Sequence, residues 1–349
     1  MSFADRVIRW QKRHGRRDLP WQGTRDAYRI WVSEIMLQQT QVAAVIPYYA
    51  RFLQRFPDVA ALASSPSSDV MAAWAGLGYY SRARNLHRCA QAVVERHEGR
   101  FPRMADELTE LPGIGRSTAA AIAAFAFGQR VAILDGNVKR VFARHFGVEG
   151  YPGVASVERR LWSIAQQELP ARGIETYTQG LMDLGATLCV RARPRCGDCP
   201  VATSCVALSQ HRVEELPAPR PAKARPVRHA TVAIVRDSRG ALLLEIRPPT
   251  GIWGGLVSLP EFDAGVNDQR LQAAIAERFA LHVELQERLP ALRHEFSHYS
   301  LVMHPRVAAV RGTLGAASPT TLWLDRAAFQ GAALPAPVRR LLRDQCGEA

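Results

Sequence analysis

The sequence predicts a multidomain protein with an all-α first domain and an α+β second domain. The chain has 349 residues, which suits about two domains. Apolar residues follow a helical spacing up to about residue 206, and strand-like patterns begin at about residue 229. A proline-rich stretch lies between them. We therefore expect a helical domain at 1–206, a linker at 207–228 and a second domain at 229–349.

Composition excludes several classes of protein. With 47% hydrophobic and 22% charged residues the chain can bury a core and is not a disordered protein. The uncharged apolar run 119–127 is far shorter than the ~20 residues of a membrane span. Asp5 and Arg6 occupy the place where a signal peptide needs its apolar segment. These features predict a cytoplasmic protein, monomeric and without a membrane partner.

Individual elements follow from periodicity and from their boundaries. Proline- and glycine-bearing breaks separate the helices predicted for the first domain, at 27–56, 68–96, 116–127, 137–144 and 157–168. The second domain has strand patterns and two helices, with strands at 229–235, 241–246 and 301–310 and helices at 268–279 and 335–344. The predicted linker is extended because residues 216–226 contain four prolines.

The positive charge is uneven along the chain. The net charge of +13 comes from 45 basic and 32 acidic residues. Residues 1–206 carry 27 basic and 18 acidic side chains, or +9, whereas 229–349 carry 13 and 12, or +1. This predicts that the first domain meets a polyanion, most simply nucleic acid. An arginine-rich genome is the alternative, but it does not explain why the surplus stops near residue 228.

Lysine is scarce, and this limits covalent chemistry. The 45 basic residues comprise 42 Arg and only Lys12, Lys139 and Lys223. A Schiff base needs an amine, which a permanently protonated guanidinium cannot supply. Few lysines are therefore available as nucleophiles, and Lys139 is the one closest to the motifs described below.

Four of the six cysteines form a cluster in the sequence. Their spacing is Cys189-x6-Cys196-x2-Cys199-x5-Cys205. Four thiols within 17 residues of a chain without an export signal indicate a metal site rather than disulfides. Zinc sites usually contain two short pairs, so this spacing favours a [4Fe–4S] cluster over zinc without excluding it. Three arginines inside the loop fit either a solvated loop or a contact with DNA phosphates.

Two further motifs lie close to each other in the sequence. Leu111-Pro112-Gly113-Ile114-Gly115 precedes a helix and allows a tight turn whose N–H groups suit a phosphate, although an ordinary turn is equally compatible. Asp135 follows twenty residues later and is a good N-cap for the next helix. Beside a nucleic-acid site, the same carboxylate can also stabilise positive charge that develops on a sugar.

One mostly apolar helix carries a polar stripe. In the helix predicted over 28–49, Glu34, Gln38 and Gln41 fall at i, i+4 and i+7 and share one face. Burial of an unpaired carboxylate is costly, so this face either lines a polar site or faces solvent. In a desolvated site the pKa of Glu34 would rise, and Glu34 would become a plausible general acid.

The order of these motifs resembles the endonuclease III superfamily of helix–hairpin–helix DNA glycosylases. Within residues 5–206, SEIMLQQTQV at 33–42, GLGYYSRARNL at 76–86 and LDGNVKRV at 134–141 resemble the MutY-type adenine DNA glycosylases. The resemblance implies base excision repair of double-stranded DNA, a [4Fe–4S] cofactor on the four cysteines, and adenine mispaired with 8-oxoguanine (or guanine) as substrate. It also implies association with the bacterial nucleoid.

Residue roles follow from the resemblance. Glu34 would protonate the flipped adenine at N7, Asp135 would stabilise the oxocarbenium-like sugar, and water would complete hydrolysis. Further matched positions would shape the adenine pocket, namely Arg17, Trp21, Leu37, Ser117, Asn137 and Gln179. Gln39 and Tyr79 would probe the duplex around 8-oxoguanine, and the hairpin glycines Gly113 and Gly115 would bind DNA phosphate.

Ser117 stands where bifunctional relatives carry a lysine. The resemblance therefore implies a monofunctional glycosylase with at most weak lyase activity. Some relatives have Tyr at this position.

The second domain resembles, more weakly, the Nudix-like C-terminal domain of the same family. The motif GGLVSLP at 254–260 is not followed by the glutamate cluster that binds a divalent metal in Nudix hydrolases, so we expect binding without hydrolysis. Phe296, Ser297 and His298 lie in RHEFSH at 293–298, which resembles the loop that reads 8-oxoguanine. A strand entry with one buried Phe is the structural alternative.

Three other functions compete with this hypothesis. One is an endonuclease III-like glycosylase/lyase acting on oxidised pyrimidines, which Glu34 and Ser117 disfavour. The second is a non-enzymatic iron–sulfur protein that binds DNA. The third is a nucleotide pyrophosphatase in the second domain, which the missing glutamates disfavour.

Overall fold

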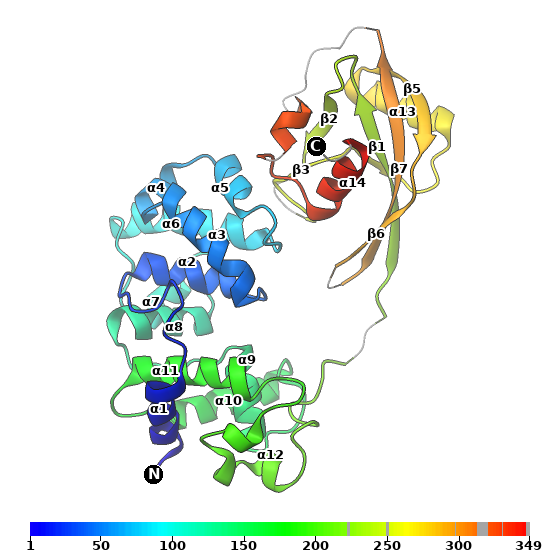
Figure 1. The fold of residues 1–349 in the computed structure, drawn as a ribbon. Coiled ribbons are helices and arrows are strands. Elements are labelled where there is room, and N and C mark those ends of the chain that lie inside the picture. Colours follow the sequence, from blue (N-terminus) through cyan, green and yellow to red (C-terminus); the bar gives the residue numbers. More distant parts are fainter. Residues whose placement is uncertain (222–223, 249–250, 297, 313–319, 330, 347–349) are drawn as a thin grey trace. The chain divides into compact units, whose positions relative to one another are not determined.

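The computed structural model divides the chain into two compact units. It describes residues 1–221, 224–248, 251–296, 298–312, 320–329 and 331–346. The first unit comprises residues 1–65 and 85–222, and the second comprises 66–84 and 223–349. The first is helical and the second contains a β-sheet (Figure 1). The sequence does not predict that residues 66–84 join the second unit.

Side-chain caps define the starts of several helices in the first unit. Asp26, Asp58 and Asp135 accept backbone N–H groups at the starts of α2, α4 and α9, as N-cap residues commonly do. Gly128 ends α8 in the left-handed conformation. The helices up to residue 97 are α1 (Phe3–His14), α2 (Ala27–Leu37), α3 (Val42–Arg55), α4 (Val59–Ser64), α5 (Ser67–Trp74, second unit) and α6 (Ser81–His97). Those after it are α7 (Ala105–Thr109), α8 (Arg116–Phe127), α9 (Gly136–His145), α10 (Ala155–Gln167), α11 (Ile174–Asp183) and α12 (Val206–Ser209).

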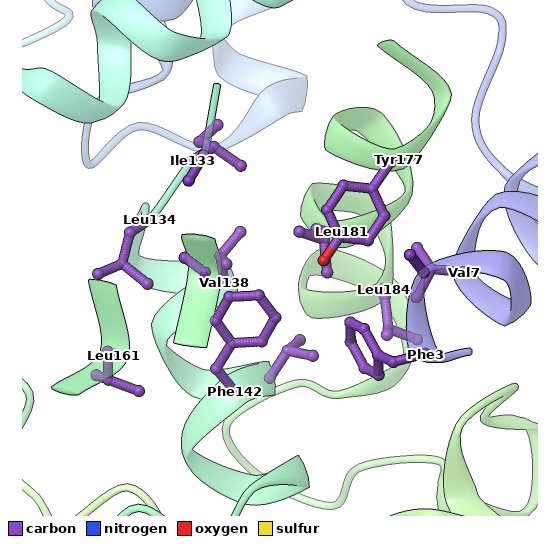
Figure 2. Close-up of a cluster of buried hydrophobic side chains, with 14 of the residues drawn as sticks. Phe3, Val7, Ile133, Leu134, Val138, Phe142, Leu161, Tyr177, Leu181 and Leu184 are labelled. Carbon is purple, nitrogen blue, oxygen red and sulfur yellow. The ribbon is translucent and has the colours of Figure 1, made fainter. Parts of the chain in front are cut away.

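The core of the first unit joins the N-terminal helix α1 to α8, α9, α10 and α11. Figure 2 shows Phe3 and Val7 of α1 facing Phe142 of α9 and Tyr177 of α11. The rings of Phe3 and Phe142 lie 5.8 Å apart, edge to face. This packing fixes α9 and α11, which carry Asp135 and Gln179, relative to α1.

The second unit is built on a mixed sheet. The strand order is β3-β2-β1-β7-β5, and β1 (Val227–Arg236) runs parallel to β7 (Ser300–Arg311). Leu271 and Ile275 of α13 (Asp268–Phe279) share a buried cluster with Val283 of β5 (His282–Arg288) (Figure 1). The remaining elements are β2 (Leu242–Ile246), β3 (Val257–Ser258), β4 (Glu261–Asp263), β6 (Leu292–Glu295), β8 (Thr321–Leu324) and α14 (Ala336–Cys346).

The predicted fold class is confirmed, but two predicted helices are wrong in extent. The helix expected over 27–56 is broken between Leu37 and Val42, and the one expected over 68–96 is broken between Trp74 and Ser81. Gly76 and Gly78 have φ values of 102° and 73°, so the sequence contained the signal for the second break. The first break occurs at Gln38–Gln41, which contains neither glycine nor proline.

Part of the expected linker packs against the helical unit. Residues 206–209 form α12. Leu216 is buried, and its carbonyl accepts a hydrogen bond from Arg144 Nε of α9 at 2.8 Å. Within the described residues, no helix is both long and apolar enough to cross a membrane.

Candidate functional site

A cavity of about 480 Å³ in the first unit gathers several of the predicted site residues. Its wall comes from the end of α1, the segment 16–25, and helices α2, α8 and α11. Arg17, Trp21, Glu34, Leu37 and Gln179, which are dispersed over 163 residues of sequence, all line it. Trp21 is buried and packs edge to face on Tyr49, with ring centroids 5.5 Å apart. The cavity is therefore the place where a base could be enclosed.

Glu34 is the acidic group that α2 directs into this cavity. Its neighbours Ser33, Ile35 and Met36 are buried in the helix. Burial, and then the negative charge of Asp135, raise the pKa of Glu34 to about 8. The carboxyl group is thus protonated at neutral pH and can donate a proton.

Asp135 combines helix capping with electrostatic coupling to Glu34. Its Oδ1 accepts from the Val138 N–H at 2.7 Å, so the capping prediction is confirmed. Burial raises the pKa of Asp135, while its hydrogen bonds with Val138 and Asn137 oppose that rise. Because Asp135 raises the pKa of Glu34, the two carboxyl groups lie within electrostatic reach of each other.

Hydrogen bonds extend from Asp135 toward the cysteine loop. Asn137 Nδ2 donates to Asp135 Oδ2 at 3.3 Å, and Arg140 Nη2 donates to Asn137 Oδ1 at 2.8 Å. Arg140 Nε donates to the Cys189 carbonyl at 2.7 Å. A Cβ at Gly185 would lie 2.5 Å from the Asn137 Cβ, so this close approach requires glycine. Asn137 therefore supports Asp135 through a hydrogen bond. Among the described residues that line the cavity, Asn137 is absent.

The predicted polar stripe on one continuous helix is wrong. Helix α2 ends at Leu37, Gln38 follows it as C-cap, and Gln41 is the N-cap of α3. Gln39 between them has φ 57° and is exposed. Only Glu34 of the three stripe residues lies within α2 and on the cavity wall, and the turn presents Gln39 to solvent.

The hairpin before α8 has the tight geometry that its glycines predict. Gly113 has φ 79°, and the Ile114 N–H donates to the Leu111 carbonyl at 3.2 Å. Gly115 is the N-cap of α8. Ser117 Oγ accepts from the Leu134 N–H at 3.3 Å, so it ties the start of α8 to the residue before Asp135. Ser117 is not part of the described cavity wall.

The sequence-based view of the lysines needs correction. Lys12, at the end of α1, lines the cavity. Lys139, the expected candidate, forms an ion pair of 2.6 Å with Glu158 and lines a different groove. The position of Lys12 at the cavity could not be predicted from the sequence, because Lys12 is far from the other cavity residues in the chain. The packing of α1 against α11 brings it there.

Cys189 follows the π-helical turn Leu184–Leu188 after α11, Cys196 and Cys199 lie at the two ends of one short 3-10 turn, and Cys205 ends the next. Burial raises the thiol pKa of Cys196, Cys199 and Cys205, and negative charge on Cys189 adds a smaller rise to each, so these sulfurs are electrostatically coupled. The described thiols are unbridged, and in the described part of the chain no three His, Cys, Asp or Glu side chains converge as a ready-made metal site. Arg144 is buried and donates to Cys189 Sγ at 3.4 Å and to the Val190 carbonyl at 2.7 Å.

A basic groove of about 660 Å³ runs beside this loop. Its wall includes Gly136, directly after Asp135, and a set of basic side chains: Lys139, Arg140, Arg144, Arg191 and Arg220. Arg140 and Arg144 direct most of their hydrogen bonds to backbone carbonyls, which carry no formal charge. The groove therefore suits a polyanion.

A second cavity, of about 390 Å³, lies within the second unit. Tyr79, Phe296 and His298 line it together with Trp253. Phe296 stacks on Tyr299 with centroids 4.7 Å apart, and Tyr79 is 49% exposed at φ 48°. Ser297 lies outside the described residues. Tyr79, Phe296 and His298, which were predicted to examine the lesion, thus lie together in one cavity. Gln39, predicted for the same role, lies in the first unit.

Sequence reasoning missed Asp183 and the two arginines that support the site. Asp183 is fully buried one helical turn after Gln179 on α11. The i, i+4 spacing of an amide and a carboxylate in TQGLMDLG was a usable signal. Arg140 and Arg144 were hidden in an arginine-rich sequence where no single arginine stands out.

Comparison with family models identifies two segments. Residues 32–167 match the model for HhH-GPD superfamily base excision DNA repair proteins, and residues 231–344 match the NUDIX domain model. An adenine DNA glycosylase of Buchnera aphidicola (from Acyrthosiphon pisum) is 33% identical over 98% of this chain and 97% of its own length. The human adenine DNA glycosylase is 34% identical over 99% of this chain and 74% of its length.

Solved structures resemble the helical part. A thermostable thymine-DNA glycosylase matches with a TM-score of 0.55 and 30% identity, covering 60% of this chain and 95% of that protein. An endonuclease III–DNA complex matches with a TM-score of 0.51 and 21% identity, covering 60% and 94%, and shows the fold alone.

Proposed function

The chain belongs to the MutY-type adenine DNA glycosylases of the HhH-GPD superfamily, and we propose that it removes adenine mispaired with 8-oxoguanine or guanine. The reaction would hydrolyse the N-glycosidic bond and leave an abasic site, as the first step of base excision repair. The observation that carries the proposal is the position of Glu34 on the cavity wall, where burial and the charge of Asp135 raise its pKa.

The two carboxyl groups have complementary roles in this reaction. Glu34 donates its proton to N7 of the extruded adenine, which makes the base a better leaving group. Asp135, held by the Val138 N–H, stabilises the positive charge that develops on the sugar. A water molecule then attacks the sugar carbon. General acid catalysis of this kind contributes about 10²–10⁴-fold in rate.

Hydrolysis without a Schiff base is the expected outcome. Ser117 is hydrogen-bonded at the start of α8 and offers no amine. Lys139 is ion-paired with Glu158 outside the cavity. We propose a monofunctional glycosylase, in which any weak lyase activity depends on Lys12 at the cavity wall.

Double-stranded DNA containing the mispair is the proposed partner. The basic groove would hold one phosphate backbone, and the turn at Gly113 and Gly115 another phosphate. The aromatic cavity with Tyr79 and Phe296 would receive the 8-oxoguanine side of the mispair. We propose that the protein works as a monomer in the cytoplasm, at the nucleoid.

We propose a [4Fe–4S] cluster on Cys189, Cys196, Cys199 and Cys205. The donor set fits by its chemistry, because the four thiols fall within 17 residues and are unbridged, and the positive charge of Arg144 opposes the rise that burial causes in the pKa of Cys196. The cluster would supply folding energy to a loop that contains little buried apolar surface. A colourless protein containing zinc would contradict this assignment.

A mispair assay tests the proposed reaction. The purified chain is incubated with an A:8-oxoguanine duplex and, separately, with a thymine glycol duplex, each analysed with and without alkali. We expect adenine release and strand cleavage only after alkali. Cleavage without alkali on the thymine glycol duplex, with no reaction on the mispair, would establish an endonuclease III-like activity instead.

A further inference from the structure

Asp183 is a fully buried carboxylate at the end of α11, beneath the adenine cavity. Its side chain is 0% exposed and forms an ion pair of 2.6 Å with Arg16. The Arg16 main-chain N–H also donates to Asp183 Oδ2 at 2.9 Å, and Gln179 Nε2 donates to Oδ1 at 2.9 Å. Arg16 and Gln179 both line the cavity.

This contact determines which end of the Gln179 amide is available to a base. An ionised carboxylate only accepts hydrogen bonds, so it requires the NH₂ end of Gln179. The reverse orientation would place the amide oxygen against a carboxylate oxygen, with two acceptors facing each other in a buried site. The Gln179 carbonyl oxygen is consequently the end left for the cavity.

We infer that Asp183 is a positioning residue that makes the cavity selective for purines with an amino group at C6. The inference rests on the proposed function. Adenine carries an N6 amine that donates to the Gln179 carbonyl, whereas guanine and hypoxanthine carry an O6 acceptor that faces it unfavourably. A site built for a hydrogen bond rejects a base that leaves its polar group unpaired.

The test compares two leaving bases in the full-length protein. Single-turnover release of adenine and of hypoxanthine, each opposite 8-oxoguanine, is measured for the wild type and for Asp183→Asn. An Asn side chain can give its carbonyl to Arg16 and its NH₂ to Gln179, which allows the Gln179 amide to reverse. We expect the hypoxanthine-to-adenine rate ratio to rise about tenfold, the effect of one hydrogen bond.

The ratio separates positioning from structural damage. If Asp183→Asn slows both bases by the same factor, the inference is wrong and Asp183 only supports the fold. If the wild type releases no adenine from the mispair, the proposed function fails independently of Asp183. Asp58→Asn is the matched control, because Asp58 caps α4 outside the cavity and Asn caps equally well.

Gln179→Leu provides a second test that does not depend on Asp183→Asn folding. We expect it to slow the release of adenine and to leave unchanged the release of purine, which has no substituent at C6. Equal slowing of both bases would overturn the inference, because Gln179 would then not read the C6 group.

Discussion

The two units differ in how deeply their acidic groups are buried. The helical unit fully buries Asp183, and burial raises the pKa of Glu34 on the cavity wall and of Asp135. The sheet unit has exposed ion pairs such as Arg311–Glu284, where the side chains are 68% and 54% exposed, and half-buried pairs such as Arg247–Glu261, at 24% and 28%. Buried charges alter reactivity, whereas exposed pairs are screened by solvent. We therefore place the proposed chemistry in the helical unit and propose that the sheet unit contributes binding.

The largest expected effect is the loss of the acid in the helical unit. Glu34→Gln should slow adenine release about 10²–10⁴-fold while binding of the A:8-oxoguanine duplex persists, because the amide is isosteric but donates no proton. Single-turnover kinetics and an electrophoretic mobility assay measure the two properties. Unchanged release would remove Glu34 from the mechanism.

The second prediction concerns the effect of pH on stability. The pKa of Glu34 is raised in the folded state to about 8, so the folded protein binds more protons than the unfolded chain at intermediate pH. The free energy of unfolding should therefore fall as pH rises from about 4.5 toward 8 and should level off above it. As the pH rises through this window, the free energy of unfolding of Glu34→Gln should become a few kcal/mol larger than that of the wild type. Urea titrations at each pH measure both values. If the free energies of unfolding of the two proteins change with pH in parallel, the pKa of Glu34 is not raised.

The third prediction concerns the arginine at the cysteine loop. Arg144→Leu should lower the free energy of unfolding by about 3 kcal/mol, because the buried carbonyl of Leu216 and the half-buried carbonyl of Val190 lose their donor. Arg130→Leu is the control, since exposed Arg130 also donates to carbonyls, those of Leu169 and Pro170. Equal losses in urea denaturation would show that burial of Arg144 is irrelevant.

The fourth prediction separates backbone strain from function. Gln39→Gly should raise the free energy of unfolding by about 1 kcal/mol, because glycine adopts φ 57° without the penalty of a Cβ, and it should weaken binding of the mispair duplex. Glu98→Gly, at an exposed residue with φ 53°, should give the same stability gain. If Glu98→Gly weakens duplex binding as much, Gln39 has no particular role there.

The smallest effect is expected in the sheet unit. Glu284→Gln should change the free energy of unfolding by less than about 0.5 kcal/mol, because its ion pair with Arg311 is exposed. Adenine release should be unaffected. A clear loss of release would show that the sheet unit influences the chemistry, and the contrast between the units would fail.

Sequence alone predicted the residues whose chemistry is local. Asp135 was predicted as a helix cap from its position before α9, and Glu34 was singled out as a carboxylate in an apolar helix. The break after Leu37 was missed, because Gln38 and Gln39 carry no local signal for a left-handed residue. That conformation is imposed by the fold rather than by residue preference.

Contacts between distant segments were beyond the sequence. Lys12 reaches the cavity only because α1 packs against α11 through Val7 and Tyr177. Asp183 meets Arg16 across 167 residues, and Arg144 meets Leu216 across 72. Such pairs leave no periodic pattern, so only the three-dimensional arrangement reveals them.

The capping bond of Asp135 separates foldability from activity. Asparagine caps helices as well as aspartate, so Asp135→Asn should leave Val138 bonded and α9 intact. Under the proposed mechanism, such a protein would fold and escape cellular quality control, and it would bind mispairs without releasing the adenine. In a cell that makes both forms, the inert copies would shield lesions from the active ones. A higher mutation frequency than that of a cell with half the amount of active protein would reveal this interference.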